Sequence, residues 1–191
     1  MKLIILDRDG TINRDSDDFV KTPDEWVPLP GALEAIARLN HAGWHVVIAS
    51  NQSGLGRGLF DVASLNAMHA KMHKLLAAVG GRIDAVFYCP HSPEEKCTCR
   101  KPLPGLFEQI GTRFGMSLRG VPTAGDSRRD LQAGAAAGCE PHLVLTGKSS
   151  QVRLGGNLPD GLPANTLMHA DLSAFVDFIL ERSAQPMQVA I

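Results

Sequence analysis

The sequence has few aromatic residues, no excess charge of either sign and no long apolar run. Its 191 residues include seven Phe, two Trp and one Tyr, too few for the platforms on which nucleic-acid bases stack. The formal net charge of −1 argues against a basic surface along the whole chain for nucleic acid or anionic lipid. No apolar run reaches the ~20 residues that cross a bilayer. We therefore expect a soluble, cytoplasmic protein that binds neither nucleic acid nor membrane.

Short runs typical of strands alternate along the chain with segments that have helical spacing. The runs lie at 2–6, 44–49, 84–88, 121–124 and 142–145. This alternation predicts an α/β, Rossmann-like doubly wound fold, with a mostly parallel sheet and helices on both faces. We expect a single domain over residues 1–182 without a large cap domain, a flexible tail over 183–191, and a monomer. In such folds ligands bind at the carboxyl ends of the strands.

Two aspartates, Asp7 and Asp9, directly follow the first predicted strand. Residues i and i+2 of an extended segment point to the same side, so the two carboxylates can face one site. Close carboxylates repel each other, which favours a bound cation or a shared proton. Asp126 follows the fourth predicted strand, where it could complete a Mg²⁺ site with Asp7. The alternative is an ordinary polar strand end.

Polar and glycine-rich residues follow the second predicted strand, in the sequence S-N-Q-S-G-L-G-R-G. Amides, hydroxyls and an arginine in such a loop can surround a phosphate. The glycine spacing differs from the dinucleotide-binding fingerprint, and the Walker A motif is absent. The loop therefore predicts a phosphate site, with the candidate ligands Ser50, Asn51, Gln52, Ser53 and Arg57.

Three cysteines and a histidine follow the third predicted strand within eleven residues, in a loop at about 89–99. They are Cys89, His91, Cys97 and Cys99. Their C-x-H…C-x-C spacing can close a tetrahedral zinc site. Four protein ligands leave no open position, so this spacing predicts structural Zn²⁺. A disulfide pair is the alternative, which a cytosolic location disfavours.

The ordered motifs resemble those of the haloacid dehalogenase superfamily of phosphohydrolases over about residues 2–148. The motifs are D-x-D-G-T from Asp7, the strand-end Ser50, Arg100-Lys101-Pro102, and Gly125-Asp126 through Asp130. The cysteine-containing loop resembles the zinc-bearing branch of that superfamily. This branch holds the D-glycero-D-manno-heptose-1,7-bisphosphate 7-phosphatases and the histidinol-phosphate phosphatases.

The resemblance implies a Mg²⁺-dependent phosphomonoesterase that works through an aspartyl-phosphate. Asp7 resembles the nucleophile, and Asp9 resembles the general acid and base, whose backbone carbonyl also binds Mg²⁺. Ser50 and Lys101 resemble the residues that hold the phosphoryl oxygens, with Asn51 close by. Asp7, Asp9 and Asp126 are thus the implied Mg²⁺ ligands.

The same resemblance leaves the substrate open between two small phosphates. Arg57 and Arg100 suit a doubly phosphorylated sugar, which favours the heptose bisphosphate of lipopolysaccharide precursor synthesis. The short gap between the histidine and the second cysteine of the zinc loop resembles the histidinol-phosphate enzymes instead. Asp15 and Asp18 are expected to add substrate contacts. A third interpretation is an inactive, zinc-stabilised binding module, which the complete set of catalytic positions disfavours.

Overall fold

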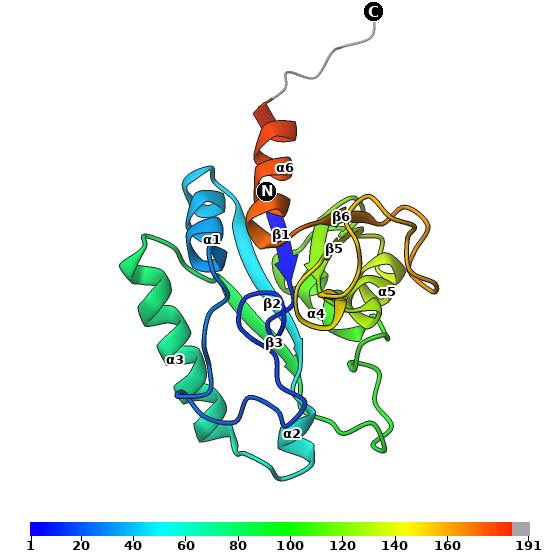
Figure 1. The fold of residues 1–191 in the computed structure, drawn as a ribbon. Coiled ribbons are helices and arrows are strands. Elements are labelled where there is room, and N and C mark those ends of the chain that lie inside the picture. Colours follow the sequence, from blue (N-terminus) through cyan, green and yellow to red (C-terminus); the bar gives the residue numbers. More distant parts are fainter. Residues whose placement is uncertain (185–191) are drawn as a thin grey trace, which may run out of the picture.

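The computed structural model describes residues 1–184 and has a six-stranded sheet at its centre (Figure 1). The strand order is β3-β2-β1-β4-β5-β6, and all neighbouring strands are parallel. The strands are β1 (Leu3–Leu6), β2 (His45–Asn51), β3 (Ala85–Cys89), β4 (Pro122–Gly125), β5 (Glu140–Val144) and β6 (Leu167–His169). The helices are α1 (Ala32–His41), α2 (Ser53–Gly56), α3 (Val62–Ala78), α4 (Gly105–Phe114), α5 (Arg128–Ala136) and α6 (Leu172–Ala184), with a 3₁₀ turn, η1 (Gly147–Ser149). The predicted doubly wound α/β fold is confirmed.

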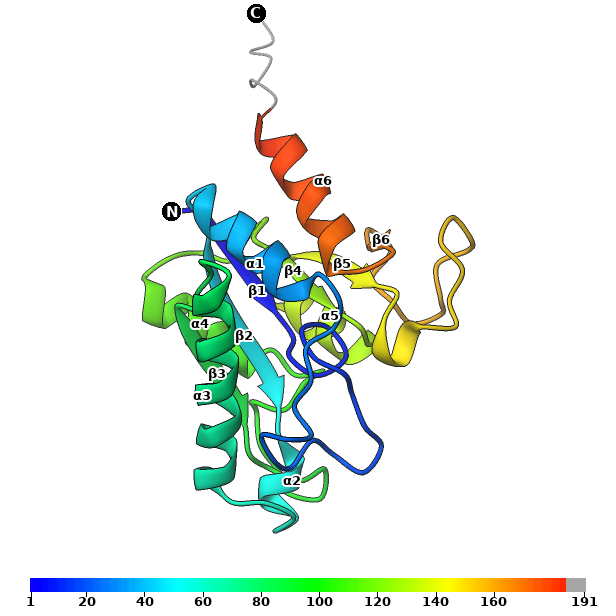
Figure 2. The ribbon, with the colours of Figure 1, turned by 60° about the vertical axis from the view of Figure 1, so that its left-hand side comes forward.

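Strand β1 is buried on both faces, as its uninterrupted apolar sequence L-I-I-L requires. Successive side chains of a strand point to opposite faces. Ile4 and Leu6 therefore pack with residues of α1, α3 and α6, whereas Leu3 and Ile5 pack with residues of α4 and α5. Figures 1 and 2 show these two groups of helices on opposite sides of the sheet.

The strand order reverses at β1, and this reversal positions the candidate site. The chain passes from β1 outward to β2 and β3, then returns to β4 on the other side of β1. Loops that leave neighbouring strands in opposite directions open a crevice at the carboxyl edge of the sheet. Asp7 directly follows β1, and its backbone N–H donates to the Ala124 carbonyl of β4 at 2.9 Å. Asp7 and Asp126 consequently lie side by side at this edge.

The structure differs from the sequence prediction at the C-terminal end of the chain. Five strands were expected, and the sixth, β6, has only three residues, of which only His169 is buried. Such a short segment carries too little apolar alternation to predict a strand. Helix α6 continues through Ser183 and Ala184, where a tail was expected, and Ser183 Oγ donates to the Ile179 carbonyl one turn earlier at 2.7 Å. The rest of the expected tail, 185–191, lies outside the described residues.

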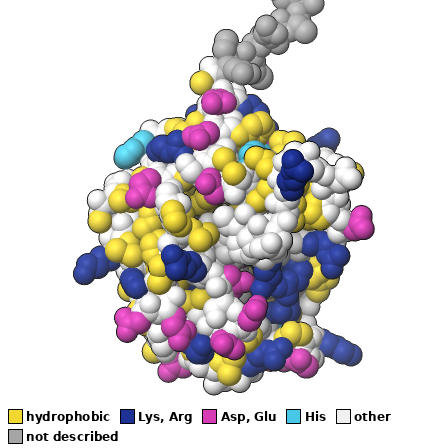
Figure 3. Space-filling view, viewed as in Figure 1, with side chains coloured by type: hydrophobic (Ala, Val, Ile, Leu, Met, Phe, Trp, Pro, Cys, Tyr) yellow, Lys and Arg dark blue, Asp and Glu magenta, His cyan; other side chains and the backbone are white. Residues whose placement is uncertain are grey.

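Charged side chains of both signs are interspersed over the face of the molecule in Figure 3. This distribution agrees with the nearly balanced composition of the chain. Among the helices described, none combines the length and apolarity needed to cross a membrane.

Candidate active site

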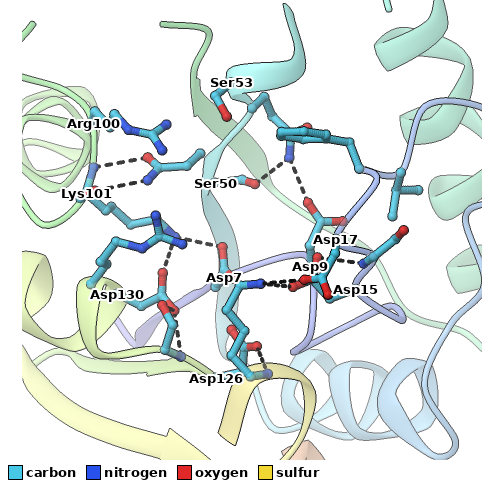
Figure 4. Close-up of a pocket in the computed structure, with 18 of the residues that line it drawn as sticks. Asp7, Asp9, Asp15, Asp17, Ser50, Ser53, Arg100, Lys101, Asp126 and Asp130 are labelled. Atoms are coloured by element: carbon cyan, nitrogen blue, oxygen red, sulfur yellow. Dashed lines mark hydrogen bonds and ion pairs between the residues drawn. The ribbon is translucent and has the colours of Figure 1, made fainter. Parts of the chain in front are cut away.

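Lys101 lines the crevice and is almost completely buried, with 2% of its surface exposed. Its Nζ lies 2.7 Å from Asp7 Oδ1 and 2.6 Å from Asp130 Oδ1, and donates to the Ala49 carbonyl at 2.7 Å (Figure 4). Burial opposes the charge of Lys101, but the carboxylates of Asp130 and Asp7 outweigh burial and raise its pKa. Lys101 is therefore a fixed cation beside the predicted nucleophile.

Asp7, Asp126 and Asp130 bring carboxylate oxygens within 4.8 Å of one another. Burial and the charge of Asp130 raise the pKa of Asp7 to about 7 and that of Asp126 to about 8. Three carboxylates held this close repel one another, and one lysine offsets only part of that repulsion. Oxygen ligands in this arrangement fit a hard divalent cation such as Mg²⁺.

Two hydrogen bonds, one to the carboxyl group and one to the backbone carbonyl, hold Asp126 in place. The backbone N–H of Lys148 donates to Asp126 Oδ2 at 2.7 Å, and Ser149 Oγ donates to the Asp126 carbonyl at 2.6 Å. Gly10 and Gly147 both have positive φ angles, +83° and +48°, and a Cβ on either would overlap Asp126 Oδ2. Both positions therefore need glycine, because any side chain there would displace the carboxyl group of Asp126.

Asp9 lies on the opposite side of the site from Lys101 (Figure 4). Its neighbour Arg8 is fully buried. Arg8 Nη2 lies 2.9 Å from both carboxylate oxygens of Asp9, and the side-chain amides of Asn13 and Gln52 donate to them at 2.8 and 3.0 Å. Burial disfavours the charge on Asp9, but Arg8 and these hydrogen bonds outweigh burial and lower its pKa. Arg8 also lies 3.4 Å from His69 Nε2 on α3. Sequence reasoning gave no role to Arg8.

The residues after β2 have distinct positions around the cavity. Ser50 Oγ accepts a hydrogen bond from Gln52 Nε2 at 2.7 Å, which links Ser50 to the group around Asp9. Asn51 forms two 3.0 Å hydrogen bonds with the backbone N–H and carbonyl of Lys101. Asn51 therefore holds the Lys101 backbone in place. Ser53 begins α2 and lines the cavity.

The four predicted zinc ligands converge beyond the end of β3. Cys89 Sγ lies 3.1 Å from Cys99 Sγ and 3.8 Å from Cys97 Sγ, and His91 Nδ1 lies 3.3 Å from Cys99 Sγ. A tetrahedral Zn²⁺ with bonds of about 2.0–2.3 Å would place its ligands at comparable separations. Three thiols and one imidazole therefore fit a closed Zn²⁺ site. Arg100 and Lys101 directly follow the last of these ligands.

The carboxyl groups around Lys101, together with Asp9 and the residues after β2, line a cavity of about 320 Å³. Asp15 and Asp17 line it together with Lys148, whose Nζ lies 2.9 Å from Asp15 and 3.8 Å from Asp17. Asp18, which was predicted beside Asp15, is exposed and does not line the cavity. Phe19 takes a positive φ of 65°, so the chain turns at this point and Asp18 stays on the outer side of the loop.

Arginines form one side of the cavity entrance. The predicted Arg57 and Arg100 both line the cavity, and so does Arg129 of α5, which sequence reasoning missed. Burial and the charge of Arg129 lower the pKa of Arg100. Arg57 is exposed and lies 3.7 Å from Glu94 and 6.0 Å from the centre of the Phe19 ring.

Comparisons with known proteins give a family and a set of similar enzymes. The family model described as polynucleotide kinase 3 phosphatase matches residues 2–148. The chain is 57% identical, over 96% of its own length and all of the relative, to a D-glycero-beta-D-manno-heptose-1,7-bisphosphate 7-phosphatase of Bordetella bronchiseptica. It is 51% identical to an enzyme of the same name from Pseudomonas aeruginosa, over 94% of this chain and 98% of that one.

Solved structures show the same similarity. The crystal structure of D,D-heptose 1,7-bisphosphate phosphatase from B. bronchiseptica, complexed with magnesium and phosphate, matches with a TM-score of 0.90 over 95% of this chain and 99% of that one. The corresponding protein from Burkholderia thailandensis matches with 53% identity and a TM-score of 0.72, over 94% and 99% of the two chains.

Proposed function

The chain belongs to the heptose-bisphosphate phosphatases of the haloacid dehalogenase superfamily, and we propose that it removes the 7-phosphate of D-glycero-D-manno-heptose 1,7-bisphosphate. The observation that carries this proposal is a chain-long likeness combined with a polar cavity around a buried Lys101–Asp7 pair. Its place would be in the synthesis of the heptose precursor of lipopolysaccharide. The substrate is a phosphorylated sugar.

Asp7 is the proposed nucleophile. Lys101 engages Asp7 Oδ1, so Oδ2 is the oxygen that we assign to attack phosphorus. The bond from phosphorus to the sugar oxygen at C7 breaks, and an aspartyl-phosphate forms on Asp7. Lys101 offsets the repulsion between the attacking carboxylate and the phosphate. Ser50, which lines the same cavity, is assigned to hold a phosphoryl oxygen.

Asp9 is the proposed acid and base. It protonates the departing sugar oxygen, then takes a proton from the water that attacks the aspartyl-phosphate, and inorganic phosphate leaves. Arg8 and the neighbouring amides favour the ionised form of Asp9, which is the form that serves as base. The negative charge of an arriving phosphate raises the pKa of Asp9 by like-charge repulsion, in the direction that the acid role requires.

The two metal sites have different proposed roles. Asp7, Asp126 and the backbone carbonyl of Asp9 would hold Mg²⁺, which supplies positive charge that lowers the repulsion between carboxylate and phosphate. The cysteines and histidine of the zinc loop would hold Zn²⁺ structurally. That loop carries Arg100 and Lys101, so its fixed shape places both cations at the cavity. We also propose that residues 1–182 act as one phosphatase domain, supported by the single continuous sheet.

Phosphate release with Mg²⁺ tests the proposed substrate. The heptose bisphosphate and histidinol phosphate are compared at matched concentrations, because the short zinc loop resembles the histidinol-phosphate enzymes. We expect kcat/KM to favour the heptose by about a hundredfold or more, equivalent to ~3 kcal/mol of transition-state preference. The reverse ratio would assign the chain to histidinol phosphate.

A further inference from the structure

The cations around the cavity differ in whether the protein itself neutralises them. Lys101 pairs with Asp7 and Asp130, Arg8 pairs with Asp9, and Lys148 pairs with acidic residues of the 15–17 loop. Among residues 1–184, the ion pairs include neither Arg100 nor Arg129. Two guanidinium groups placed close together without a carboxylate repel each other, and an anion from outside the protein would relieve that repulsion.

Arg100 and Arg129 also lie together at a second cavity. A hollow of about 430 Å³ adjoins the reaction cavity and shares four lining residues with it, Pro93, Arg100, Lys101 and Arg129. It extends toward the zinc loop. In Figure 4 Arg100 lies on the same side of the site as Lys101, and Asp9, Asp15 and Asp17 lie on the other side. The site thus has a cationic side next to an opening with room for more of a substrate.

Arg129 and its neighbour Arg128 point in different directions, although both belong to the first turn of α5 and both are exposed. Consecutive helical residues do not share a face. Arg128 packs beside Gly161. Both arginines line a neighbouring hollow with Pro159 and Leu162, but only Arg129 also lines the reaction cavity. Dark blue Lys and Arg side chains gather at the lower right of Figure 3. Arg128 and Arg129 carry the same charge, so Arg129 is distinguished by its position at the reaction cavity.

We propose that Arg129 determines specificity, by binding with Arg100 the second, non-reacting phosphate of the substrate. This inference rests on the proposed function, because that substrate carries two phosphates. Lys101 and Asp7 hold the reacting phosphate on the floor of the cavity, and Arg129 engages the distal one at the entrance. Guanidinium groups bind phosphate through paired, charge-assisted hydrogen bonds, and two of them on one side of the entrance fit a dianion.

The test compares Arg129→Gln with Arg128→Gln, which removes the same charge one residue away. For each enzyme, kcat/KM is measured with Mg²⁺ on the heptose 1,7-bisphosphate and on the heptose 7-phosphate that lacks the distal phosphate. We expect the bisphosphate-to-monophosphate ratio to fall about tenfold in Arg129→Gln, mainly through KM, and to stay within about twofold in Arg128→Gln. Arg129→Lys, which keeps the charge, should recover part of the ratio.

The outcomes separate this inference from the proposed function. An unchanged ratio in Arg129→Gln, or an equal fall in both glutamine variants, would overturn the role of Arg129 while leaving the heptose phosphatase intact. A wild-type enzyme that does not hydrolyse the bisphosphate would overturn the proposed function and this inference with it. Thermal unfolding of each variant checks that the fold is retained.

Discussion

Replacing Lys101 with Met should lower the free energy of unfolding by about 3–5 kcal/mol at pH 8, the cost of removing one partner from a buried ion pair. Lys101 Nζ lies 2.7 Å from Asp7, 2.6 Å from Asp130 and 2.7 Å from the Ala49 carbonyl. Met has a similar length and fills much of the same volume, so the loss is mainly electrostatic. The remaining carboxylates would face one another without their common cation.

The cost should be smaller at pH 5 than at pH 8. Burial and Asp130 raise the pKa of Asp7 to about 7, against the lowering effect of Lys101, so removing Lys101 raises it further. A carboxyl group whose folded pKa exceeds its unfolded value favours the folded state below the unfolded pKa. That contribution is lost as the pH rises through the folded pKa. The variant should therefore lose stability between about pH 4 and pH 8 more steeply than the wild type.

Urea unfolding in EDTA at both pH values measures this effect without bound Mg²⁺. Lys148→Met is the matched control, because the Lys148 side chain is 46% exposed in its ion pair with Asp15. An exposed pair contributes at most about 1 kcal/mol. A cost below about 1 kcal/mol for Lys101→Met at pH 8, or an equal cost at both pH values, would refute this reasoning.

Three further predictions follow from other parts of the structure. Asp7→Asn should abolish phosphate release and keep the wild-type circular dichroism spectrum; measurable turnover would remove Asp7 as nucleophile. Cys97→Ala should lower both the zinc content and the Tm, and a purified wild type without zinc would contradict the closed site. Burial lowers the pKa of His142 to about 3 and also lowers that of His169. The free energy of unfolding should then fall as the pH drops below about 6.5, where the unfolded histidines take up protons, and fall less in His142→Leu; an unchanged slope in this variant would show that His142 does not contribute.

The positions of several site residues could be predicted from the sequence because strand ends determine them. In a parallel sheet, carboxyl ends lie at one edge, so residues that directly follow β1 and β4 must lie close together. Asp7 and Asp126 meet this condition, and the structure places them side by side. The convergence of Cys89, His91, Cys97 and Cys99 was predictable for a related reason, since these residues lie within eleven positions and need no distant contact.

Other features depend on contacts between distant segments, which local patterns do not specify. The ion pair of Lys101 with Asp130 and the packing of Arg8 against His69 each join residues far apart in the sequence. Asp18 was expected at the cavity, but the turn at Phe19 keeps it outside. The role that we propose for Arg129 could not be predicted from the sequence. It depends on Arg128 and Arg129 pointing in different directions, and these directions depend on where α5 begins.

Phosphorus NMR of the reaction product tests the central claim most directly. The heptose 1,7-bisphosphate is incubated with the enzyme and Mg²⁺ until one equivalent of phosphate has formed. The account predicts that the 7-phosphate signal disappears, that the signal coupled to the anomeric proton remains, and that Asp7→Asn leaves both signals unchanged. Loss of the anomeric phosphate, or release of phosphate by Asp7→Asn, would contradict the account.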